Sequence, residues 1–104
     1  MKYTKELYGK TSIDSLDSEE LDKDYKIELE YYQIKDETAD KPYGIEVVKR
    51  YKGEGIRSTE EKEICNICNT KNNTNRVLDI LISNKVTPVA LEDVLHDFAV
   101  DNII

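Results

Sequence analysis

Two cysteines three positions apart have the most definite chemistry in this chain. Cys65 and Cys68 form a CxxC pair in the 104-residue sequence, and such a pair can supply two thiolates to zinc. A structural zinc site needs four ligands, and the single histidine, His96, raises the number within one chain to three. A dimer that shares one ion could complete the set. We favour two small apolar side chains instead, because in a regular strand residues three apart point to opposite faces.

Catalysis by these residues has little support from their surroundings. A redox CxxC requires a first thiol whose pKa is lowered at a helix N-terminus, and several residues separate Cys68 from the next expected helix. His96 is a candidate acid–base group, but it falls on the expected wet face of a helix with no nucleophile paired to it. We therefore expect no enzyme, no catalytic residue and no cofactor. Cys65, Cys68 and His96 stay as low-ranking candidate metal ligands.

The charge of the chain bears on its partners. The formal net charge is −7, from 22 acidic and 15 basic residues. Such a chain is repelled by phosphate backbones, so we expect no direct nucleic-acid binding and no binding to a membrane. Residues 10–23 are rich in acidic and serine side chains, and we expect them to form an exposed, flexible loop. Asp17, Glu19 and Glu20 in this loop are candidate contacts for a basic protein partner.

Tyrosine is the main aromatic residue, with seven copies against one phenylalanine and no tryptophan. Tyrosine is common both at the rim of a buried core and in the hot spots of protein interfaces. Tyr32 leans to the wet side of an expected strand, and Tyr51 lies near an expected turn beside basic residues. These two are our candidate interface tyrosines.

The elements that must position these residues follow from the hydrophobic pattern. Alternation predicts a short edge strand over 2–9 and a strand region over 24–68, in which antiparallel neighbours are joined by short loops. After Asn69 the period becomes helical, and residues 70–100 are expected to form a helical hairpin. Thr87 is the expected N-cap of its second helix, and Pro88 the expected first helical residue.

This order of elements predicts an α+β fold in one domain, residues 1–104. It consists of an antiparallel β-meander of about four strands followed by two C-terminal helices packed on one face. The helix pair has the outline of a helix-turn-helix, but its second helix carries acidic residues where a DNA reader needs basic ones. We interpret the pair as a packing element.

The segment from Leu81 to Val94 resembles part of an uncharacterised small-protein family of Gram-positive bacteria. The resemblance rests on an Asn-Lys-Val-Thr-Pro turn at 84–88 and on a Tyr-Gly-Ile strand at 43–45, and it covers roughly residues 24–98. The acidic segment falls outside it. The resemblance implies a compact domain and gives no activity or site.

These observations favour a non-enzymatic protein-interaction or regulatory module with an unidentified protein partner. The alternative is an acidic inhibitor or decoy that binds a basic nucleic-acid-binding protein. A homodimer is left open. The chain begins with charged residues and contains no run long enough to cross a bilayer, so we expect a cytoplasmic protein.

Overall fold

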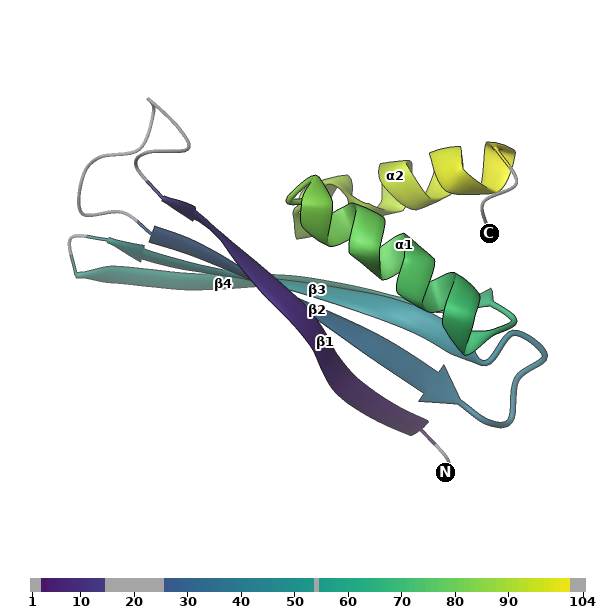
Figure 1. The fold of residues 1–104 in the computed structure, drawn as a ribbon. Coiled ribbons are helices and arrows are strands. Elements are labelled where there is room, and N and C mark those ends of the chain that lie inside the picture. The colour runs from purple at the N-terminus through teal and green to yellow at the C-terminus, as the bar shows by residue number, and fades with distance from the viewer. Residues whose placement is uncertain (1–2, 15–25, 54, 102–104) are drawn as a thin grey trace.

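A four-stranded antiparallel sheet and two helices make up the computed structural model, which describes residues 3–14, 26–53 and 55–101 (Figure 1). The elements, in chain order, are β1 (Tyr3–Asp14), β2 (Lys26–Asp36), β3 (Tyr43–Gly53), β4 (Ile56–Cys68), α1 (Lys71–Ser83) and α2 (Pro88–Val100). The strands lie in the order β1-β2-β3-β4, each beside its neighbour in the chain. The predicted α+β meander followed by two helices is therefore confirmed.

Both helices pack on the same face of the sheet, as Figure 1 shows. The core lies beneath them, because alternate strand residues and the apolar stripes of the helices all point into this layer. Its fully buried members are Leu29, Tyr31, Ile45, Val47, Val77, Leu78, Leu81 and Leu91. Tyr31 is the largest of them, and its hydroxyl donates a hydrogen bond to the backbone carbonyl of Val86 at 2.8 Å.

Threonine residues cap the N-termini of both helices, and Thr87 was the expected one. Thr70 is the N-cap of α1, and its hydroxyl oxygen accepts a hydrogen bond from the backbone N–H of Asn73 at 3.1 Å. Thr87 is the N-cap of α2 and Pro88 opens that helix, although the Thr87 side chain makes no capping hydrogen bond. Lys85, in the turn between the helices, has a φ of 50°, so the chain reverses through a left-handed residue.

The first strand is longer than the sequence predicted. β1 continues to Asp14, so the prediction that residues 10–14 belong to a loop is wrong. Thr11 lies opposite Leu29 and Ile13 opposite Ile27 in the ladder, and Ile13 packs against the core. Because this stretch is mostly polar, the alternation of its side chains between the two faces of a strand was not recognised in the sequence. Residues 15–23 of the predicted loop lie outside the described residues.

Two irregularities shape the sheet. The register between β1 and β2 shifts between Leu7 and Gly9, and a shift of this kind bends the bulged strand. The register between β3 and β4 shifts near Gly44, where an added Cβ would lie 2.6 Å from the Ile64 carbonyl oxygen. Asn66, in the extra length of β4, has a φ of 60° and donates through its side-chain amide to the Lys41 carbonyl at 3.0 Å. Close backbone approach thus requires glycine at position 44.

Neither helix in the described part of the chain has the length and apolar character needed to span a bilayer.

Candidate binding face

The side of the sheet opposite α1 and α2, here called the open face, is the candidate functional surface. Neither helix covers it (Figure 1). The register assigns Tyr32, Ile34, Glu46 and Val48 to this face, because they alternate with the core residues Tyr31, Ile45 and Val47. Its two ends carry opposite charges.

The end near the start of β1 contains two carboxylates directly opposite each other, Glu46 on β3 and Glu63 on β4. Like charges in such positions destabilise a sheet unless they are compensated. Here Lys5 supplies the compensation, since its ammonium donates to a Glu46 carboxylate oxygen at 2.9 Å. Tyr3 is hydrogen-bonded to Glu63. Two side chains of an edge strand thus reach over β2: Lys5 neutralises a carboxylate on β3, and Tyr3 donates a hydrogen bond to a carboxylate on β4.

The titration of these groups reflects the same contacts. The hydrogen bond from Tyr3 holds the pKa of Glu63 below its usual range. The hydrogen bond to Glu46 raises the pKa of Lys5. Burial, with the bond to Glu63, raises the pKa of the Tyr3 hydroxyl. All three groups are therefore held in their ordinary charge states at neutral pH.

This end also explains two buried apolar side chains on a face without a helix. Ile34 is 0% exposed and Val48 is 4% exposed. Lys5 lies directly opposite Ile34 in the ladder, and its ammonium lies 5.4 Å from the centre of the Tyr32 ring. The long side chains of the sheet itself therefore cover these two residues.

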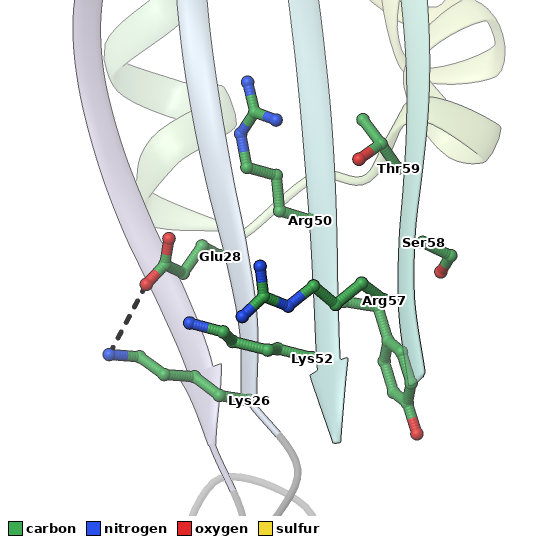
Figure 2. A pocket seen from close by; sticks show the side chains of 8 residues that line it. Lys26, Glu28, Arg50, Lys52, Arg57, Ser58 and Thr59 are labelled. Carbon is green, nitrogen blue, oxygen red and sulfur yellow. Dashed lines mark ion pairs between the residues drawn. The ribbon is translucent and has the colours of Figure 1, made fainter. Parts of the chain in front are cut away.

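The opposite end of the open face is cationic (Figure 2). Lys26, Lys52 and Arg57 lie directly opposite one another on β2, β3 and β4, and we call them the cationic row. Arg50 lies two residues along β3 from Lys52, and Glu28 is the one carboxylate among the residues that line the shallow cavity here, of about 230 Å³. In Figure 2 the Arg57 side chain runs across β3 towards Lys52.

Ion pairs neutralise only part of this end. Lys26 pairs with Glu28 at 3.5 Å, and Arg50 pairs with Glu30 at 3.1 Å. Lys52 and Arg57 have no ion-pair partner among the side chains that the structure describes, which do not include those of residues 14 and 56. The cationic row therefore keeps a local positive charge on a chain of net charge −7.

The two candidate tyrosines differ in their surroundings. Tyr32 lies on the open face, half-buried, and its hydroxyl donates to Glu30 at 3.1 Å. Leu7 lies directly opposite it and is 48% exposed. Tyr51, also half-buried, is paired with Ile27 and Ser58, so the register places it on the other face of the sheet, although it lines the cavity at this end. Asp17, Glu19 and Glu20 lie outside the described residues.

The three candidate metal ligands are not brought together. Cys65 is half-buried on the open face, where its thiol donates to Glu63 at 3.3 Å, whereas buried Cys68 is hydrogen-bonded to Thr74 of α1. His96 is exposed on α2. Burial raises the pKa of both thiols, which keeps them protonated and makes them poorer metal ligands and nucleophiles. Over the described ranges no three His, Cys, Asp or Glu side chains are grouped for a metal ion.

Sequence reasoning missed the cationic row. Its members lie far apart along the chain, and each is an ordinary surface residue by composition. Only the pairing of Lys26 with Lys52 and of Lys52 with Arg57 aligns them, and register depends on loop lengths and bulges. The basic residues around Tyr51 were the signal available in the sequence.

Comparison with known proteins gives a family and no activity. Residues 10–101 match the model of a family of unknown function, DUF6514. The match begins at residue 10, so the expectation that the acidic segment falls outside the family is wrong. No curated protein and no solved structure matches the chain.

Proposed function

We propose that this chain, which belongs to the DUF6514 family of unknown function, is a non-enzymatic protein-interaction module that uses its open face. One observation carries the proposal: Leu7 stays 48% exposed beside half-buried Tyr32, on a face that no helix covers. An exposed leucine beside a tyrosine, with charged side chains around them, supports a protein contact on this face.

The described chemistry supports binding rather than catalysis. The two thiols are protonated, and His96 is exposed on the far helix, away from the open face. The free cysteines fit a reducing compartment, so the proposal places the module in the cytoplasm. The alternative role, an acidic decoy for a basic partner, depends on Asp17, Glu19 and Glu20, which are not described.

Site-specific photo-cross-linking in cells tests the proposal. A photoreactive phenylalanine analogue at position 7 reports on the open face, and the same analogue at position 97, an exposed site on α2, is the control. We expect a protein adduct from position 7 that is absent at position 97. The adduct should be lost when Tyr32→Glu places a charge beside the cross-linker. Equal adducts at both positions, or none at position 7, would contradict the proposal.

A further inference from the structure

The cationic row is an unfavourable arrangement in the isolated protein. Directly opposite side chains on neighbouring strands have Cβ atoms about 4.5–5.5 Å apart, and like charges at this separation destabilise the sheet. Lys52 stands in this relation to two cations at once, Lys26 on one side and Arg57 on the other. At the other end of the open face, the opposed pair Glu46 and Glu63 is compensated by Lys5 and Tyr3. No described residue does the same for Lys52 and Arg57.

Such a local conflict in an otherwise consistent fold is typical of a functional site. A bound anion would replace repulsion between the three cations with attraction to a shared centre. The net charge of −7 does not prevent this, because the Debye length is about 8 Å at physiological ionic strength and the nearest charges dominate.

We infer that the cationic row binds a phosphate group. A phosphate monoester carries close to two negative charges and three acceptor oxygens, whereas a carboxylate carries one charge and two oxygens. Three cations on adjacent strands can balance the charge of a phosphate and donate hydrogen bonds to its three oxygens. Arg50 and Thr59, which also line the cavity, lie two residue pairs further along the ladder and on the same face as the row. Figure 2 shows how these side chains surround the cavity.

The phosphate can belong to a small molecule or to a phosphorylated side chain of a protein. In the second case the row forms one end of the proposed protein-binding face, and the inference then rests on the proposed function. The cross-linker at position 7 does not touch the row. Its adduct can therefore still form when the row binds no phosphate. Failure of the phosphate inference is thus distinguishable from failure of the proposed protein-binding function.

The test is an NMR titration of the full chain with pyrophosphate and with a phosphoserine peptide, beside the same peptide carrying glutamate. We expect shift changes at Lys26, Lys52 and Arg57. The double variant Lys52→Gln, Arg57→Gln should bind at least tenfold more weakly. The control Lys35→Gln, Lys62→Gln removes the same charge from residues paired with Glu37 and Glu92, and should bind as the parent does.

Each outcome decides the inference. Tighter binding of the phosphopeptide than of pyrophosphate assigns the phosphate to a protein partner, and the reverse order assigns it to a small molecule. The inference is overturned if neither probe binds at millimolar concentration. It is also overturned if the glutamate peptide binds as well as the phosphopeptide, or if both double variants lose binding equally.

A second readout does not depend on finding the natural ligand. Because the row is repulsive when empty, the Lys52→Gln, Arg57→Gln variant should unfold at a higher temperature than the parent without phosphate. Added pyrophosphate should raise the unfolding temperature of the parent and leave that of the variant unchanged. A variant that is less stable than the parent without ligand would contradict the argument from repulsion.

Discussion

The hydroxyl of Tyr31 donates to the carbonyl of Val86 at 2.8 Å, and this bond joins the centre of the sheet to the turn between the helices. Both groups are buried, so the Val86 carbonyl depends on Tyr31 for its partner. The bond adds a directional contact to the apolar packing that holds the helical hairpin on the sheet. The turn also holds Lys85 in a left-handed conformation.

Tyr31→Phe is therefore expected to lower the free energy of unfolding by about 1–3 kcal/mol, the cost of an unpaired buried acceptor. Urea denaturation measures the change. Tyr32→Phe is the matched control, since it removes a hydroxyl whose bond to Glu30 is only partly buried. Equal losses for the two variants would show that the bond to Val86 stabilises the fold no more than the bond to Glu30 does.

Gly44→Ala should destabilise the fold more than Gly9→Ala. An added Cβ at position 44 meets the backbone of Ile64 and Cys65 at 2.6 and 2.8 Å, and backbone cannot move aside cheaply. At position 9 the Cβ meets the end of the Ile82 side chain at 2.8 Å, which can turn away. Overpacking of this kind costs about 1–3 kcal/mol. Thermal unfolding followed by circular dichroism compares the two, and a larger loss at position 9 would contradict the assignment.

Acid should weaken the carboxylate end of the open face. The pKa of Glu63 is lowered in the folded state by the bond from Tyr3, so its contribution to stability is present above its unfolded pKa. That contribution is lost as the pH falls through the lowered folded pKa. Tyr3→Phe removes the donor and should raise the pKa of Glu63 towards 4.5, its ordinary value. A carbon-13 titration of the carboxyl group measures this, and an unchanged pKa would exclude Tyr3 as the cause.

Lys5→Met should cost more stability than Lys62→Met. Lys5 pairs with a Glu46 side chain that is 6% exposed, so its removal leaves a buried acceptor without its cation, at a cost of about 1–3 kcal/mol. Lys62 pairs with a Glu92 side chain that is 74% exposed, and exposed pairs contribute about 0–1 kcal/mol. Chemical denaturation of both variants gives the comparison. A double-mutant cycle with Glu46→Gln should show coupling for Lys5, and its absence would contradict this view.

The fold was largely predictable because its signals are local. The alternation around Leu29 and Tyr31, the capping oxygen of Thr70 and the Thr87-Pro88 pair each act within a few residues. The extension of β1 was missed because Thr11 and Ser12 resemble loop residues, although their ladder partners are in the sheet. In that stretch tertiary pairing outweighs composition.

The open face was predictable only in part. The position of Tyr32 on the wet side followed from alternation, and so did the separation of Cys65 from Cys68. The charged ends could not be predicted from the sequence. Lys52 lies beside Lys26 and Arg57 only because two strand pairings bring them together. The ion pair between Lys5 and Glu46 depends on how β1 bends over the sheet. This bend cannot be predicted from a short segment of the sequence.

The meander order of the sheet has a consequence for how the chain acquires its structure. The strands β2, β3 and β4 each pair with the strand before them in the chain, so each pairing costs less chain entropy than a pairing between strands distant in the sequence would. Proteins with such local pairing fold quickly. The bridge from Lys5 to Glu46 spans 41 residues and cannot form until the third strand has joined the first two. We expect it to be absent from the folding transition state, so that its loss accelerates unfolding and leaves the folding rate unchanged.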